Sequence, residues 1–246
     1  MPDTRSHRGI DPRDGDAFAP GEWEKLRSAV ADLSWLHSRA YAEPSALKLV
    51  GDRHGLTARQ RDAVRRSACS DAALRRRLEH RVTLDRVRGL PLGIDGFNVL
   101  TTIETALGGG VILVGRDGSF RDLAGVHGTY RKVEETRPAL LLLGNCLERS
   151  GIGPCAWYLD SPVSNSGRLR GIILELAQER GWPWQVELVF NPDPILAASP
   201  EPVATADSAI LDRCHAWVPL TRAIIEAEVS EAFVVDLSDS EGVSLK

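Results

Sequence analysis

Apolar residues in the first third of the chain recur with helical spacing. Five of them lie three or four positions apart and form one predicted stripe: Trp23, Leu26, Val30, Leu33 and Leu36. Pro20 and Glu22 suit the first turn of such a helix, and the pattern stops near Tyr41 and Pro44. The spacing therefore predicts a helix that begins near residue 20 and packs along one side.

Three shorter helices are predicted to follow. One spans 45–50 and ends at Gly51, and a second begins at Thr57, whose hydroxyl can cap the chain ahead of Gln60. A third is expected to be capped by Asp71 and to run toward Val87. Residues 20–89 thus form a small all-α module, whereas residues 1–19 lack periodicity and are predicted to be a disordered tail.

The pattern changes beyond Gly89. Short apolar runs and amphipathic segments now alternate, at 111–114, 139–147, 156–159, 169–177, 186–190, 203–205, 216–220, 223–228 and 233–237. This alternation is typical of βαβ units with a mainly parallel sheet covered by helices on both faces. We predict a three-layer α/β domain over residues 90–238 and a flexible tail at 239–246.

The amino-acid composition excludes several classes of protein. The 246 residues carry a net charge of -4 and are 43% hydrophobic, which excludes disordered, collagenous and disulfide-stapled chains. The charge is uneven, because residues 52–90 hold eleven arginines and five acids. This excess of unpaired positive charge predicts contact with a polyanion such as nucleic acid, with Arg59, Arg65 and Arg66 as candidates. A solvated face, or a face that docks another domain, is the alternative.

The sequence contains no membrane or secretion signal that we recognise. No window approaches the roughly 18 consecutive apolar residues of a membrane span, and residues 1–20 lack an apolar centre. We therefore expect a cytoplasmic protein without membrane contact. The cysteines are irregularly spaced and are expected to be reduced, mostly buried thiols.

Aspartates follow three of the predicted strands. Asp95 follows a predicted strand that ends at Ile94, Asp160 follows Leu159, and Asp207 follows Ala206. If these strands are neighbours, the carboxylates meet at one edge of the sheet, and an all-oxygen cluster of this kind binds Mg²⁺ or Mn²⁺. Asn98 is then a candidate to orient a metal-bound water. The alternative is that each aspartate caps a helix or forms a turn, and that Asn98 only fixes the turn at Asp95.

A possible phosphate site follows Asp160. Ser164, Asn165 and Ser166 open a predicted helix, whose free N–H groups can hold a phosphate. Capping of that helix by Ser164 or Asn165 is the compatible structural interpretation.

Two motifs in the α/β part resemble the PIN-like superfamily of metal-dependent ribonucleases, including its NYN branch. They are Asp95-Gly96-x-Asn98 and Thr205-Ala206-Asp207-Ser208-Ala209-Ile210. The resemblance covers about residues 90–237. It implies that Asp95, Asp160 and Asp207 hold Mg²⁺ or Mn²⁺ for phosphodiester hydrolysis. It also implies a fourth acid, but Pro219 stands at the corresponding position, which leaves Asp212, Asp117 and Asp122 as candidates.

The helical part resembles a different family, the prokaryotic domain of unknown function 434, over about residues 24–80. The motifs that carry this resemblance include Leu49-Val50-Gly51-Asp52-Arg53, Leu56-Thr57-x-Arg59-Gln60-Arg61 and Cys69-Ser70. The resemblance implies no activity.

Together these observations predict a metal-dependent phosphodiester hydrolase, a ribonuclease whose basic helical module holds RNA. Two alternatives stay open. One is a catalytically inactive nucleic-acid-binding adaptor with the same fold, and the other is an enzyme that acts on a small phosphorylated molecule.

Overall fold

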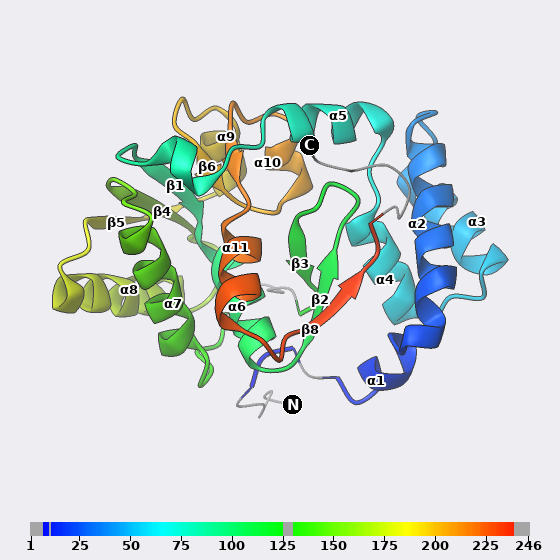
Figure 1. Ribbon diagram of the computed structural model, residues 1–246, viewed down its shortest axis with the longest axis horizontal. Coiled ribbons are helices and arrows are strands. Elements are labelled where there is room, and N and C mark those ends of the chain that lie inside the picture. Colours follow the sequence, from blue (N-terminus) through cyan, green and yellow to red (C-terminus); the bar gives the residue numbers. More distant parts are fainter. Residues whose placement is uncertain (1–6, 10, 125–129, 239–246) are drawn as a thin grey trace.

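The computed structural model describes residues 7–9, 11–124 and 130–238 (Figure 1). A helical N-terminal region precedes an α/β unit built on a five-stranded parallel sheet. The prediction of an α/β fold with a helical N-terminal part is therefore confirmed. The predicted tail at 239–246 lies outside the described residues.

The helices of the N-terminal region are α1 (Asp14–Ala17), α2 (Trp23–His37), α3 (Glu43–Arg53), α4 (Ala58–Ser67) and α5 (Asp71–Glu79), with 3-10 turns at Pro20–Glu22 and Leu84–Val87. Thr57 caps α4 as predicted, because its hydroxyl accepts from the Gln60 N–H and the Gln60 side chain accepts from the Thr57 N–H. The prediction for α5 was wrong in two respects. Ser70, rather than Asp71, caps this helix, which ends at Glu79, well before Val87.

Part of the predicted N-terminal tail is ordered. Phe18 is fully buried among the N-terminal helices, and Asp14 in α1 forms a two-pronged ion pair with Arg59 at 2.7 and 2.8 Å. Arg8 is paired with the buried carboxylate of Glu104 in the α/β unit. The segment therefore contributes a core residue and two buried charge pairs, which its lack of periodicity does not indicate.

The main sheet is formed by β5 (Trp184–Val189), β4 (Cys155–Asp160), β1 (Leu92–Asp95), β6 (Val203–Ala204) and β7 (Trp217–Val218), in that order. All four pairings are parallel. The central strand β1 lies between β4 and β6, so the three strands that end in the predicted aspartates are neighbours.

Helices cover both faces of this sheet. The face that carries Ile94 and Trp157 packs against α6 (Gly96–Leu107), α7 (Thr136–Arg149), α8 (Ser166–Arg180) and α11 (Leu220–Glu228). The opposite face, which carries Tyr158, packs against α9 (Pro192–Ala197) and α10 (Ser208–Leu211). The unit therefore has the three layers that the alternation predicts.

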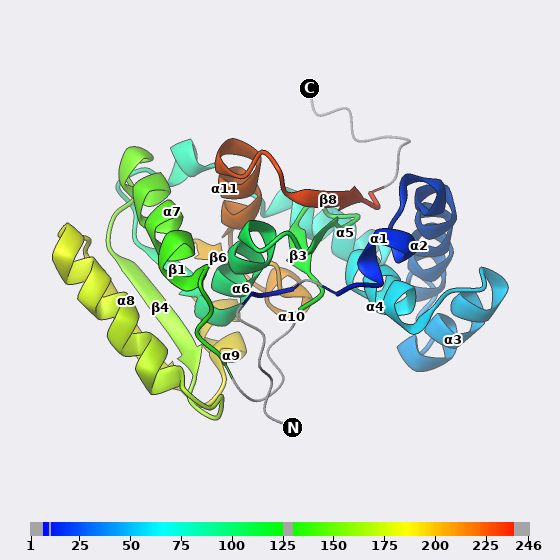
Figure 2. The same cartoon turned by 90° about the horizontal axis from the view of Figure 1, so that it is seen from below.

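Two of the predicted strands form a second sheet. β2 (Val111–Val114) lies between β8 (Phe233–Asp236), which is parallel to it, and β3 (Phe120–Asp122), which is antiparallel. One face of β2, with Ile112 and Val114, joins the core around α6, and the other joins the core of α2, α3 and α4. Figure 2 shows this sheet between the main sheet and the N-terminal helices. The helices and the second sheet thus share one hydrophobic core.

All four cysteines are buried and free, as predicted. Within the described ranges, we find no helix whose length and apolar character would allow it to cross a membrane.

Candidate functional site at the carboxyl edge of the main sheet

The edge of the main sheet where β4, β1 and β6 end carries the three predicted aspartates. Gly93 faces Leu196 of α9, and because side chains alternate along a strand, Asp95 lies on the same face. Tyr158 packs on that face as well, so Asp160 two residues later also points toward the α9 side. The fold therefore brings these carboxylates to one edge and one face of the sheet.

The turn after β1 is tight. A Cβ atom at Gly96 would lie 2.5 Å from a methyl of Leu159 and 2.9 Å from the Tyr158 carbonyl oxygen. Only glycine lets α6 begin this close to β4. Asp95 is buried there, and its carboxylate accepts a 2.7 Å hydrogen bond from the Thr205 hydroxyl, which links β1 to the chain after β6.

The position of Asp207 is fixed by hydrogen bonds of its own side chain and of the preceding residue. Its Oδ1 caps α10 by accepting from the Ala209 and Ile210 N–H groups. Ala206 is fixed from two sides, since its N–H donates to Asn98 Oδ1 at 2.8 Å and its carbonyl accepts from Arg121 Nε at 2.8 Å. The capping alternative is thus realised for Asp207. Asn98 positions the loop that carries it.

A fourth acid, Asp193, lies near these three. It stands in the first turn of α9, directly after β5, and Asn191 caps this helix through the Asp193 N–H. In the sequence, the two prolines of Asn191-Pro192-Asp193-Pro194 indicate a loop and suggest no chemical role for Asp193. The signal that could have found Asp193 is the one used for the others, an acid shortly after a strand of the parallel sheet.

Asp95, Asp160 and Asp193 each have a raised pKa, and the charge of a neighbouring carboxylate contributes to each rise. Burial raises the pKa of Asp95 to about 7, with the Thr205 hydrogen bond opposing the rise and the charges of Asp207, Asp193 and Asp160 adding to it. Burial and the charge of Asp193 raise the pKa of Asp160, and burial and Asp207 raise that of Asp193. The acids therefore concentrate negative charge at this edge of the main sheet. Below about pH 7, the protonated form of Asp95 is favoured over the ionised form.

The donor set fits a hard divalent cation, because it consists of carboxylate oxygens. Among the residues that the structure describes, however, no three His, Cys, Asp or Glu side chains stand close enough together to hold a metal ion.

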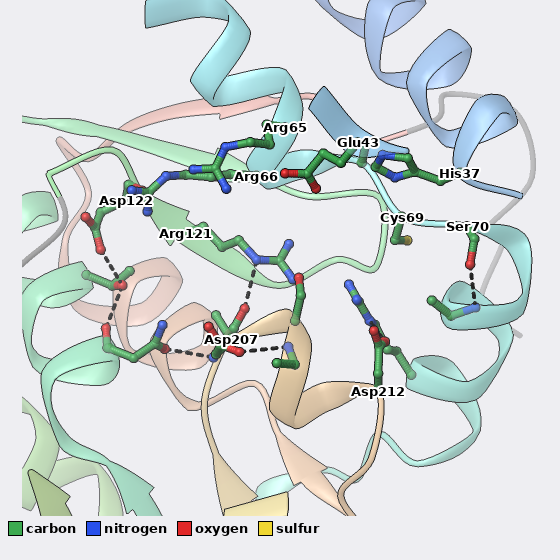
Figure 3. A pocket seen from close by; sticks show the side chains of 18 of the residues that line it. His37, Glu43, Arg65, Arg66, Cys69, Ser70, Arg121, Asp122, Asp207 and Asp212 are labelled. Carbon is green, nitrogen blue, oxygen red and sulfur yellow. Dashed lines mark hydrogen bonds and ion pairs between the residues drawn. The ribbon is translucent and has the colours of Figure 1, made fainter. Parts of the chain in front are cut away.

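A cavity of about 670 Å³ adjoins this edge and lies between the helical region and the α/β unit. Asn98 and Asp207 line it from the α/β unit, and Arg65 and Arg66 line it from α4. Figure 3 shows the two arginines on one side, Asp207 on the other and Arg121 between them. Asp95 and Asp160 do not line this cavity, so the predicted site residues divide between the cavity and the sheet edge behind it.

The arginines of residues 52–90 are paired more fully than the sequence predicts. Six form ion pairs with carboxylates: Arg53, Arg59, Arg61, Arg65, Arg66 and Arg77. Several of the partners, including Asp14 and Asp32, come from outside this stretch, which is why the local count of charges missed them. Arg59 is committed to Asp14 and does not line the cavity. Against the excess of six positive charges that the sequence count gives, five arginines of the stretch form no ion pair with a described carboxylate: Arg75, Arg76, Arg81, Arg86 and Arg88.

Two of the candidate fourth acids belong to a buried ion network. Asp117 is fully enclosed and accepts from Arg77 at 2.7 Å and from Arg121 at 2.6 Å. Burial alone raises the pKa of Asp117, but the two guanidinium groups hold it well below its ordinary value. Asp212 pairs with the other side of Arg77 at 2.7 Å. This network joins α5 to the β2–β3 turn and supports Arg121, which in turn holds Ala206.

Asp122, the third candidate, lines the same cavity from β3. Its carboxylate accepts from the Thr102 hydroxyl at 3.0 Å and from the Ala124 N–H at 2.7 Å. It lies in the second sheet, away from the strand ends that carry the other acids.

The predicted phosphate contacts lie at the start of α8. Asn165 precedes the helix in a left-handed conformation (φ 70°) and does not cap it with its side chain. Instead the Asn165 amide donates to the Tyr130 carbonyl at 2.9 Å, while the Ser164 carbonyl accepts from the Tyr130 N–H at 3.0 Å. Ser166 is buried. The capping prediction was thus wrong for the side chain of Asn165, which anchors residue 130.

Comparison with known families now adds to this geometry. The model of the family described as "Domain of unknown function (DUF5616)" matches residues 84–223, more than half of the chain. The chain belongs to the DUF5616 family. The model described as "Protein of unknown function (DUF434)" matches residues 25–80, which confirms the resemblance of the helical part.

A relative of this DUF5616 chain is the uncharacterized protein MJ0935 of Methanocaldococcus jannaschii. It is 32% identical over 186 residues, which cover 76% of this chain and 88% of the relative. No solved structure matches the chain.

The two matched segments divide the site between them. The DUF5616 segment contains all four acids of the sheet edge, and the DUF434 segment contains Arg65 and Arg66. The large cavity is therefore lined by residues from both segments.

Proposed function

We propose that this DUF5616 chain is a metal-dependent phosphodiester hydrolase that acts on RNA. The observation that carries the proposal is that Asp95, Asp160 and Asp207 follow three adjacent parallel strands at one edge of the sheet. Ligands of parallel α/β sheets bind at this edge. Asp193 supplies the further acid that the resemblance to PIN-like nucleases implies.

The charge of the edge supports a cation as the missing component. Burial and the charges of neighbouring carboxylates raise the pKa values of Asp95, Asp160 and Asp193, and Mg²⁺ or Mn²⁺ would offset the repulsion between these charges and favour an ionised Asp95. Asp95, Asp160 and Asp207 would hold the ion. Bound there, the ion would orient a water and neutralise charge on the scissile phosphate.

The residues of the chain have separate tasks in this proposal. Asn98 and Arg121 position Asp207 through the Ala206 backbone. Arg65 and Arg66 face the cavity from the opposite wall and would contact the phosphates of the substrate. The proposed role of Ser164, Asn165 and Ser166 is to contact a neighbouring phosphate at the start of α8.

Cleavage of end-labelled single-stranded RNA by the full chain tests the proposal. We expect shortening of the RNA with Mg²⁺ or Mn²⁺ and none with a chelator. Asp95→Asn and Asp207→Asn should each abolish cleavage while the thermal midpoint shows a folded protein. Asp85→Asn is the matched control, because Asp85 is exposed and forms no ion pair among the described residues. Equal cleavage by all four proteins contradicts the assignment.

The second candidate is a catalytically inactive RNA-binding protein. It is favoured by the observation that, within the described part of the chain, no three acidic side chains stand at metal-binding distance. Such a protein binds RNA equally well in chelator and in metal and never shortens it. An enzyme acting on a small phosphorylated molecule would instead bind no RNA at physiological salt and would hydrolyse a substrate such as p-nitrophenyl phosphate.

A further inference from the structure

A second, smaller groove of about 220 Å³ lies at the start of α8. Its rim carries Arg131, Lys132 and Arg168, and its floor includes Leu169 and Ile172. None of the described residues that line this groove is acidic. The groove is thus positively charged with an apolar floor, unlike the large cavity, where acids and arginines are mixed.

The three cations are available for a ligand. All three side chains are exposed, and none of them forms a hydrogen bond or ion pair with any described residue. This distinguishes them from Arg59, Arg65 and Arg66, whose guanidinium groups are already paired with Asp14 or Asp62. Unpaired cations lose no existing partner when an anion binds, so they contribute more to binding than paired ones.

Hydrogen bonds hold the chain at one side of the groove in place. The backbone of residue 130 is joined to α8 through Ser164 and Asn165, and the Tyr130 hydroxyl donates to the buried Glu104 carboxylate at 2.6 Å. Arg8 donates to the Arg131 carbonyl at 2.7 Å. These contacts fix the backbone of residues 130 and 131 beside the start of α8.

The position of the groove relates it to the acidic edge. β4 ends at Asp160, and α8 begins at Ser166, so the groove and the carboxylates lie at the same end of β4. α8 covers the face of the sheet opposite to the one that Asp95 and Asp160 face, so a strand bound in the groove would pass over the end of β4 to reach the acidic edge. A groove with a cationic rim and an apolar floor suits a ribose-phosphate strand, whose phosphates repeat and whose sugars and bases offer apolar surface.

We propose that Arg131, Lys132 and Arg168 bind the phosphodiester backbone of single-stranded nucleic acid. This inference rests on the proposed hydrolase function in one respect, since the strand held here is the strand that would be cut. It differs from that function in naming a groove outside the Arg-rich helices as the main phosphate contact.

The test measures binding in chelator, so that it does not depend on hydrolysis. The probe is a fluorescein-labelled single-stranded 12-nucleotide RNA, followed by anisotropy between 50 and 300 mM salt. The variant carries Arg131→Gln, Lys132→Gln and Arg168→Gln. The matched control carries Arg75→Gln, Arg86→Gln and Arg88→Gln, which removes the same charge from three exposed arginines whose side chains form no hydrogen bond or ion pair with a described residue.

We expect the groove variant to bind RNA at least about tenfold more weakly than the wild type. The slope of log K against log salt should also be shallower by about 2, because each of the three lost phosphate contacts on a single strand contributes about 0.7 to that slope. The control should change the affinity by less than about threefold. Equal weakening of both variants, or no weakening of the groove variant, overturns the proposal.

Two further outcomes are informative. Polyglutamate that binds as tightly as RNA, or wild-type protein that binds no RNA, overturns the assignment of nucleic acid as ligand. RNA that binds through the groove but is never cut in Mg²⁺ or Mn²⁺ supports the groove and contradicts the hydrolase. The two proposals therefore fail in different experiments.

Discussion

The buried carboxyl of Asp95 makes a prediction about the stability of the whole fold. Its pKa is raised from 3.8 to about 7, chiefly by burial. Below pH 3.8 the side chain is protonated in both the folded and the unfolded chain. Between pH 3.8 and about pH 7, the unfolded chain releases the proton and the folded chain keeps it, so the folded state loses stability as the pH rises.

The size of this loss follows from the same values. One pH unit corresponds to about 1.4 kcal/mol, so the difference between 3.8 and about 7 corresponds to about 4 kcal/mol. Asp95→Asn removes the titration while its amide oxygen can still accept from the Thr205 hydroxyl. Between pH 4 and pH 8, the free energy of unfolding of the wild type should therefore fall by about 4 kcal/mol relative to that of the variant. This change with pH does not depend on the difference in stability between the two proteins at pH 4.

Urea unfolding followed by tryptophan fluorescence, in chelator and across this pH range, measures the gain. Asp85→Asn serves as the control, since the exposed Asp85 should give a difference from wild type that does not vary with pH. A difference between Asp95→Asn and wild type that stays constant within about 1 kcal/mol, or that shrinks as the pH rises, refutes the reasoning.

Four other changes test the packing, the ion network and a helix cap. Asp117→Asn leaves two buried guanidinium groups without their shared carboxylate and should lower the free energy of unfolding by about 3–5 kcal/mol, measured in urea at pH 7. Gly144→Ala places a methyl group against the Trp182 ring and should lower the free energy of unfolding by about 1–3 kcal/mol, with altered tryptophan fluorescence. Gly171→Ala places its methyl group where no atom lies within 4 Å and should stabilise α8 by about 0.5–1 kcal/mol. Thr57→Ala removes the cap of α4 and should lower the thermal midpoint by an amount equivalent to about 1 kcal/mol; an unchanged midpoint contradicts the role of the capping box.

Local patterns were sufficient for the elements whose stabilising contacts lie nearby in the chain. The stripe from Trp23 to Leu36 became α2, and the Thr57 cap was visible because its partner is only three residues away. The apolar runs of the parallel strands were recognisable, since strands buried on both faces have few polar positions. The DUF434 resemblance was found for a related reason, because it rests on short contiguous motifs.

Contacts between distant segments needed the folded chain. Nothing near Asp14 or Arg59 indicates that they form a pair, because 45 residues separate them. The division of the predicted strands between two sheets has the same cause, since β2 and β8 pair across more than a hundred residues. A count of charges along the sequence cannot detect such pairs, which is why the Arg-rich stretch seemed to have more free charge than it has.

The candidate site combines both kinds of information. The sequence by itself determined which strands end in aspartate, because a strand and the residue that follows it are neighbours in the chain. Only the tertiary structure decided that those strands are adjacent, that Asp193 joins them, and that Asp117 belongs to a buried ion network instead. It did so because strand order, burial and the resulting pKa of Asp95 depend on contacts between residues far apart in the chain, which no local pattern encodes.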